Sequence, residues 1–255
     1  MTETTTSDRP VAVITGASAG LGLALAHGLA GLGWRLVIDG RRAELLESAA
    51  EEIRRGVPDP QDEAGATDSG GDVIAIAGDV TDARHREELA AVVAGLGRLD
   101  LLVNNASHLG PSPQPELADY PLDELRRVYE VDVIAPIALT QHLLPVLKAS
   151  GGTVISISSD AAVEAYEGWG GYGSAKAALD HASAVLAAEQ PELAVYAVDP
   201  GDLRTAMHQA AFPGEDISDR PEPATVVPAF LRLIATRPPS GRYRAAEFAS
   251  VEVGA

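Results

Sequence analysis

The chain of 255 residues contains no cysteine, which excludes disulfide bonds, a thiolate nucleophile and a cysteine metal site. Basic residues are also few: 19 Lys and Arg stand against 37 Asp and Glu, and the formal net charge is −18. This charge argues against nucleic acid or an anionic membrane as the main partner. The sequence also lacks a run of about 18 apolar residues, the length that crosses a membrane. We therefore expect neither a nucleic-acid-binding protein nor a membrane protein.

The first ten residues, MTETTTSDRP, are polar and lack the apolar core of a signal peptide. We expect a disordered tail over residues 1–9 and a cytoplasmic protein. Residues 10–255 fit one large domain, because 46% of the chain is hydrophobic and can fill a sizeable core. Within this domain, residues 56–72 are rich in Gly, Pro and Asp, which predicts a flexible surface loop.

Short apolar runs rich in β-branched residues alternate with helical patterns along the chain. This alternation predicts an α/β fold with a single doubly wound, mostly parallel sheet flanked by helices, of the Rossmann-like kind. Ligands of such folds bind at the carboxyl ends of the strands. Asn104, Ser159 and Pro200 each lie where a predicted strand ends, so we expect them at one site.

A glycine-rich turn follows the first predicted strand, residues 11–15, and precedes a helical pattern that runs to Gly33. The turn contains Gly16, Gly20 and Gly22. Glycines in this position let the backbone approach a pyrophosphate closely, and the start of the helix offers free N–H groups and a partial positive charge. The turn therefore predicts a dinucleotide-binding site.

A second constellation joins Ser159 to Tyr172 and Lys176. On a helix, Tyr172 and Lys176 lie one turn apart on the same face. The ordinary pKa of Tyr is about 10, and a neighbouring ammonium lowers it. A hydroxyl such as that of Ser159 can orient a substrate oxygen, so the three groups can donate a proton to an alkoxide or accept one from an alcohol. Taken alone, the pair also fits a half-buried Tyr beside a solvated Lys.

Several motifs together resemble those of one family: TGASAGLG at residues 15–22, Asn-Asn-Ala at 104–106, Ser159, Tyr172-x-x-x-Lys176, and Pro-Gly at 200–201. In this order, from about residue 11 to residue 245, they are similar to the short-chain dehydrogenase/reductase family. The resemblance implies hydride transfer between a nicotinamide cofactor and a carbonyl compound or secondary alcohol. It makes Tyr172 the general acid/base, has Lys176 hold the nicotinamide ribose, and has Ser159 polarise the carbonyl oxygen.

The resemblance also assigns residues to the cofactor. They are Gly16, Ser18, Gly20, Leu21, Gly22, Arg41, Asp79, Val80, Asn105, Ala106, Tyr172, Lys176, Pro200, Gly201, Leu203 and Thr205.

The end of the second predicted strand bears on the choice between NAD and NADP. An acidic residue there binds the ribose 2′-hydroxyl, whereas an Arg accommodates a 2′-phosphate. Asp39 points to NAD, but in the family the selecting acid falls at position 40, which is Gly40 here, and Arg41 follows. We expect NADP, with NAD as the alternative.

For the substrate, a small carbonyl compound or alcohol, we select His108, Tyr166 and Trp169 as contacts and residues 206–223 as a lid. No metal site is predicted. The helices predicted at 122–148 and 172–189 resemble those with which the family forms dimers and tetramers, so we expect a homodimer or homotetramer.

One position departs from the family, because Asp132 stands where an Asn is the fourth catalytic residue. Pro136 has no N–H to bond the carbonyl of Asp132, which can therefore keep the family's role of holding a relay water. The carboxylate would lie near Lys176 and raise its pKa. We expect a reduced relay; the alternatives are a dinucleotide-binding regulatory or scaffold protein with weakened catalysis, and a lyase or epimerase that retains its cofactor. Ser107 replaces a family glycine, which we interpret as a mild change.

Overall fold

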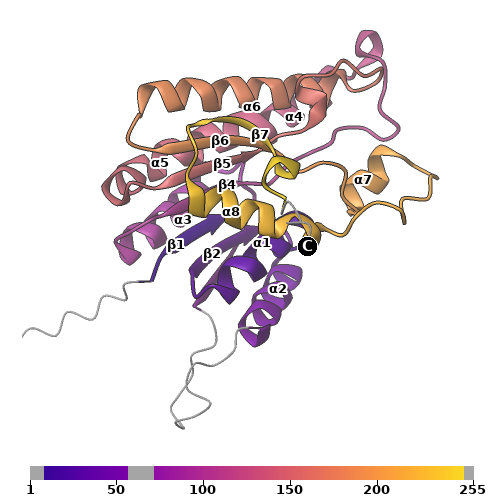
Figure 1. Ribbon diagram of the computed structural model, residues 1–255. Coiled ribbons are helices and arrows are strands. Elements are labelled where there is room, and N and C mark those ends of the chain that lie inside the picture. The colour runs from indigo at the N-terminus through magenta and orange to yellow at the C-terminus, as the bar shows by residue number, and fades with distance from the viewer. Residues whose placement is uncertain (1–8, 57–71, 250–255) are drawn as a thin grey trace, which may run out of the picture.

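The computed structural model describes residues 9–56 and 72–249. The predicted tail at 1–9 and the predicted loop at 56–72 lie outside these residues except for their end positions. Within the described residues, seven strands form one sheet in the order β3-β2-β1-β4-β5-β6-β7 (Figure 1). The strands are β1 Val11–Ile14, β2 Arg35–Gly40, β3 Val73–Ala77, β4 Leu101–Asn104, β5 Thr153–Ile157, β6 Ala194–Asp199 and β7 Gly241–Arg244.

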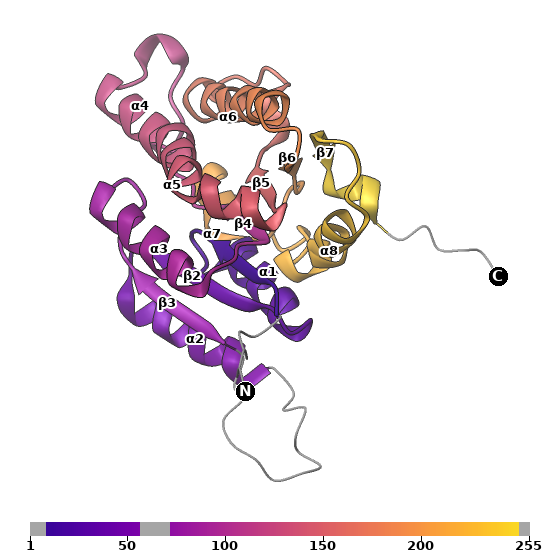
Figure 2. The same cartoon turned by 90° about the vertical axis from the view of Figure 1, so that its left-hand side faces the viewer.

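All six strand pairs are parallel, which confirms the predicted doubly wound Rossmann-like sheet. Central strands β1 and β5 are buried along their whole length because helices cover both faces. The helices are α1 Gly20–Gly31, α2 Ala43–Gly56, α3 Ala83–Leu96, α4 Leu122–Tyr129, α5 Ala135–Ser150, α6 Gly170–Glu189, α7 Ala206–Ala211 and α8 Val227–Thr236. Figure 2 shows α1, α2 and α8 on one face of the sheet, and α3, α5 and α6 on the other.

The helix predicted over 122–148 forms, but it contains a π-helical turn at Glu130–Ile134 between α4 and α5. The reason is Pro136, which cannot supply the N–H that Asp132 would need in a regular α-helix. By length and composition the continuous helix Leu122–Ser150 could also cross a membrane. Half of its apolar window is buried inside the protein, as in the core helix of a soluble protein, so this resemblance is weak evidence for a membrane span.

Strands β1 and β4 are neighbours in the sheet although β2 and β3 separate them in the chain. The connections that leave these two strands run in opposite directions, which opens a crevice above their carboxyl ends. The glycine-rich turn after β1 and the Asn-Asn-Ala segment at the end of β4 are in contact at the base of this crevice.

Candidate active site

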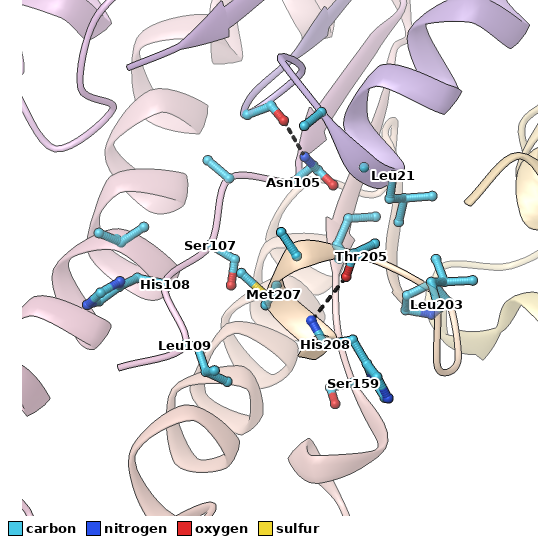
Figure 3. A pocket seen from close by; sticks show the side chains of 18 of the residues that line it. Leu21, Asn105, Ser107, His108, Leu109, Ser159, Leu203, Thr205, Met207 and His208 are labelled. Carbon is cyan, nitrogen blue, oxygen red and sulfur yellow. Dashed lines mark hydrogen bonds between the residues drawn. The ribbon is translucent and has the colours of Figure 1, made fainter. Parts of the chain in front are cut away.

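A cavity of about 780 Å³ lies at the carboxyl ends of the strands. This volume is within the range of roughly 300–1,000 Å³ that is typical of ligand sites. In Figure 3, Leu21 and Asn105 lie at one end of it, and Ser159, Met207 and His208 lie towards the other. The cavity thus extends from the glycine-rich turn to the beginning of α6 and to α7.

The glycine-rich turn packs tightly against the segment after β4, because two of its glycines leave no room for a side chain. Gly16 has φ +66°, and a Cβ there would lie 2.9 Å from the Cα of Ala106. A Cβ on Gly22 would lie 2.5 Å from Nδ2 of Asn105. Asn105 in turn donates to the carbonyl oxygen of Thr15 at 2.8 Å, which joins the turn to the segment after β4. Ala19 at the start of α1 makes no side-chain cap, so the first N–H groups of the helix are available to a pyrophosphate.

The side chain of Asp39, at the end of β2, is hydrogen-bonded to the glycine-rich turn and is close to His85. Its Oδ1 accepts a hydrogen bond from the backbone N–H of Gly16 at 2.6 Å, and its Oδ2 lies 3.1 Å from Nε2 of His85 on α3. The side chain is 2% exposed. Arg41, by contrast, is exposed and lines the cavity, where its charge contributes to lowering the pKa of Asp79 against the opposing effect of burial. At this end of the cavity, Arg41 and Arg42 are exposed, whereas the side chain of Asp39 is buried.

Tyr172 and Lys176 lie together at the start of α6, as predicted. Nζ of Lys176 is 5.4 Å from the centroid of the Tyr172 ring and donates to the carbonyl oxygen of Ile157 at 3.0 Å. Lys176 is 1% exposed and Tyr172 is 8% exposed, although both line the cavity. The strand β5 therefore positions the ammonium, and α6 places the phenol above it.

Asp132 lies behind this pair and is completely buried. Its Oδ2 is 3.7 Å from Nζ of Lys176, which confirms the predicted proximity. The same oxygen accepts a hydrogen bond from Oγ of Ser107 at 2.8 Å, and Oδ1 accepts one from the backbone N–H of His108 at 2.7 Å. Ser107, interpreted above as a mild change, is thus a direct partner of the other residue that departs from the family.

Burial and these contacts together set the direction in which the pKa values of Tyr172, Lys176 and Asp132 are shifted. Burial raises the pKa of Tyr172, and although the Lys176 ammonium and the Ser107 hydroxyl lower it, the net direction is upward. The expected lowering by Lys176 is present, but burial outweighs it. Burial alone would lower the pKa of Lys176, but Tyr172 and Asp132 raise it overall, as predicted for Asp132. Burial likewise raises the pKa of Asp132 against the charge of Lys176.

Ser159 lies at the end of β5 and lines the cavity, as predicted, but its hydroxyl is engaged. Its Oγ donates to Oδ1 of Asp160 at 2.9 Å and accepts from the backbone N–H of Ala161 at 3.2 Å. Oδ2 of Asp160 accepts from the phenol of Tyr166 at 3.0 Å.

The predicted lid contributes the helix α7. Thr205 caps this helix by accepting from the N–H of His208 at 3.1 Å (Figure 3). Met207 and His208 line the cavity. The ring of Phe212, just after α7, lies 5.9 Å from that of Trp169, so an aromatic contact joins the lid to the start of α6.

Most of the residues selected from the sequence line this cavity, and four lie elsewhere. Asn104 is buried, with its Nδ2 3.5 Å from Oγ1 of Thr140. Asp132 is behind Tyr172 and Lys176, Gly22 is packed beneath the turn, and Tyr166 lines a neighbouring hollow on the outside of α6. Met207 and His208 belong to the predicted lid at 206–223, whereas Ser107 and Asp160 were not among the predicted site residues. Adjacency to the predicted residues is the signal that points to Ser107 and Asp160.

The fold and this cavity define a Rossmann-like dinucleotide-binding protein. The sequence model of the family described as short chain dehydrogenase matches residues 10–216. The chain belongs to the short-chain dehydrogenase/reductase family of oxidoreductases.

Individual relatives span most of the chain. It is 36% identical to a sepiapterin reductase of Mus musculus over 212 residues, which are 79% of this chain and 77% of the relative. It is 34% identical to a serine 3-dehydrogenase of Agrobacterium fabrum over 197 residues, 76% of this chain and 72% of that one. A Shigella flexneri structure described as a short chain dehydrogenase complexed with NADP is 30% identical, with a TM-score of 0.81, over 94% of this chain and 97% of that chain.

Proposed function

We propose that the protein transfers a hydride between NADP and a carbonyl compound or secondary alcohol. The observation that carries this proposal is the convergence of Ser159, Tyr172 and Lys176 on the cavity that the glycine-rich turn opens. In reduction, Tyr172 donates its proton to the forming alkoxide; in oxidation, it accepts the proton of the alcohol. The nicotinamide, when bound, supplies or accepts the hydride.

Lys176 supports this chemistry by its charge, which favours the phenolate form of Tyr172. Ser159 orients the substrate oxygen, and His108 and Trp169 lie close enough to the reacting end to contact the substrate. Tyr166 would reach the substrate only through Asp160, to which its phenol donates.

The proposal of NADP rests on Arg41 and Asp39. Asp39 already holds Gly16 and His85, whereas Arg41 is exposed at the cavity and can pair with a 2′-phosphate. The similar Shigella flexneri structure complexed with NADP supports the same choice.

We further propose that the protein acts in the cytoplasm as a homodimer or homotetramer on small molecules. The helices α5 and α6 would form the contacts between subunits, and the acidic net charge disfavours nucleic acid and membrane partners.

A fluorescence titration with NADPH and NADH tests the cofactor. Arg41→Ala should weaken NADPH binding by about tenfold or more and leave NADH binding nearly unchanged, because it removes only the partner of the 2′-phosphate. Arg55→Ala, at the far end of α2, is the matched control for loss of one exposed Arg. Equal loss of both nucleotides in Arg41→Ala would contradict the assignment.

Turnover is then followed by nicotinamide absorbance with a panel of ketones. Tyr172→Phe should reduce kcat by about 10²–10⁴-fold while NADPH still binds, because only the proton donor is lost. A Tyr172→Phe protein as active as the wild type would refute the role of Tyr172.

A second candidate function is favoured by one observation, the approach of Asp132 to Lys176 at 3.7 Å. A carboxylate there competes with Tyr172 for the ammonium, and a dinucleotide-binding regulator with weakened catalysis would follow. Under this alternative, Asp132→Asn would raise turnover substantially; under the main proposal, the wild type is already active.

A further inference from the structure

The hydroxyl of Ser159 points at a carboxylate instead of at the substrate space. A carboxylate has no proton to donate, so Ser159 must be the donor in its 2.9 Å contact with Oδ1 of Asp160. Its remaining bond, from the N–H of Ala161, uses Ser159 as an acceptor. To bond a carbonyl oxygen, Ser159 must turn its proton away from Asp160. A ketone without a further donor group cannot replace the hydrogen bond that Asp160 then loses.

The charge of Asp160 is not balanced by a neighbouring cation. Oδ1 accepts from Ser159 and from the backbone N–H of Ala161, and Oδ2 accepts from Tyr166. All of these donors are neutral. Among residues 9–56 and 72–249, no Lys, Arg or His forms an ion pair with Asp160.

Three cations on the elements near Asp160 have other carboxylate partners. Lys176 faces Asp132, Arg220 pairs with Asp202 and Asp219, and Arg242 pairs with Asp180 and Asp199. Asp160 is half-buried and lines the cavity. When Ser159 turns its proton away, Oδ1 regains a lone pair, so this carboxylate can accept a hydrogen bond from a ligand there.

Aromatic rings stand beside the carboxylate. The ring of Trp169 lies 5.9 Å from that of Tyr172 and 6.4 Å from that of Tyr166, in edge-to-face arrangements. Trp169 lines the cavity, as does Asp160. A carboxylate and an aromatic ring that line the same cavity can together bind an ammonium group, by a charge-assisted hydrogen bond and a cation–π contact.

We propose that Asp160 binds a protonated amine of the substrate, and that the protein acts on 1,2-amino ketones and the corresponding amino alcohols. This inference rests on the proposed oxidoreductase function. The distance between Oγ of Ser159 and Oδ1 of Asp160 suits two heteroatoms on neighbouring carbons in a staggered conformation. The oxygen of such a substrate bonds Ser159 and Tyr172, and its nitrogen bonds Asp160.

The arrangement links recognition to reaction. When an ammonium pairs with Asp160, the carboxylate no longer depends on the Ser159 hydroxyl, which becomes free to donate to the carbonyl oxygen. The hydride goes to the carbonyl carbon, and the proton of Tyr172 goes to the oxygen. The amine takes no part in the reaction. When a ketone without the amine binds, the hydrogen bond between Ser159 and Asp160 is broken and no new donor replaces it.

A matched pair of ketones tests the inference. In 2-amino-1-phenylethanone an ammonium takes the place of the terminal methyl group of propiophenone, so the two differ chiefly in charge. With NADPH, wild-type kcat/KM should favour the amine by about tenfold or more, as expected for a charge-assisted contact. Asp160→Asn should reduce this preference by about tenfold or more, mainly by slowing the amine.

Glu164→Gln is the control, because it removes one exposed negative charge from the same loop and should keep the preference. Equal kcat/KM for the two ketones in the wild type, or an unchanged preference in Asp160→Asn, would overturn the inference. Asp160→Ser replaces Asp160→Asn if the latter has a strongly lowered Tm.

If neither ketone is reduced, a measurement of ligand binding tests the inference instead. Calorimetry compares 2-amino-1-phenylethanol with 1-phenyl-1-propanol. Tighter binding of the amine that Asp160→Asn abolishes supports the inference, and equal binding or none by either alcohol refutes it. The NADPH titration of the same proteins stays independent, because Asp160 forms its hydrogen bonds with Ser159, Ala161 and Tyr166 and none with Arg41 or the glycine-rich turn. If the wild type bound neither NADPH nor NADH, the proposed function would be refuted, whatever the result for Asp160.

Discussion

Ser107 and Asp132, the two residues that depart from the family pattern, are in contact. An Asn in place of Asp132 has both a donor and an acceptor, whereas a carboxylate can only accept. Ser107 supplies the O–H that satisfies Oδ2, while the N–H of His108 satisfies Oδ1. The buried carboxylate is therefore tolerated because a hydroxyl accompanies it.

Stability measurements can show that this pair acts as a unit. Ser107→Ala should lower the free energy of unfolding by about 1–3 kcal/mol, because it leaves a buried carboxylate oxygen without its donor. In an Asp132→Asn background the same change should cost less, since a neutral amide is less expensive to leave unpaired. Urea unfolding of the four proteins measures the coupling. Strictly additive effects would mean that the contact carries no energy.

The pH dependence of activity follows from the groups around Tyr172. Burial raises its pKa, Lys176 and Ser107 lower it, and Asp132 and Asp160 raise it. Ketone reduction needs protonated Tyr172, so it should persist until pH rises through this raised pKa. Alcohol oxidation needs the phenolate, so it should increase over the same range.

Asp132→Asn removes a negative charge that raises the Tyr172 pKa. Its alcohol-oxidation profile should therefore shift to lower pH. Profiles of kcat/KM for both proteins between about pH 6 and 11 test this. Identical profiles would also contradict the expected penalty of Asp132 on the relay.

At the scale of elements, the glycine-rich turn is held by Asp39 at the end of β2 and by Asn105 after β4, and His85 of α3 in turn contacts Asp39. Gly22→Ala should lower the free energy of unfolding by about 1–3 kcal/mol and weaken binding of both nucleotides, because the new Cβ would overlap Asn105 and the carbonyl oxygen of Gly16. Gly31→Ala, in the same helix, meets nothing within 4 Å and is the matched control. Equal effects of the two substitutions on nucleotide affinity would contradict this account.

The elements themselves were predictable because their signals are local. Hydrophobic periodicity and the Gly and Pro positions indicate each strand and helix, and parallel strands must gather their carboxyl ends at one edge. The side-chain partners were not predictable. Asp39 could have faced a ribose instead of Gly16 and His85, and Ser159 could have faced the substrate instead of Asp160. Such choices depend on distances between segments that the sequence does not contain.

For the whole molecule, the proposed assembly can be tested on α6. Val185 on this helix is 42% exposed, an apolar side chain that a subunit contact would cover. Light scattering should give a dimer or tetramer for the wild type and smaller particles for Val185→Lys, because a buried, unpaired ammonium is costly. Leu32→Lys, at 62% exposure beyond the end of α1, is the control. A monomeric wild type would refute the proposal.

The crevice between β1 and β4 has a consequence for engineering. The chain before β4 supplies the glycine-rich turn and Arg41, and the chain after it supplies Ser159, Asp160 and α7. The residue proposed to bind the 2′-phosphate thus precedes β4 in the sequence, and the residues proposed to bind the substrate follow it. Substitutions of Arg41 and Asp160 should combine additively, because the hydrogen bonds of Asp160 involve only Ser159, Ala161 and Tyr166. A chimaera joined near Asn104 could take its nucleotide preference from one parent and its substrate from the other.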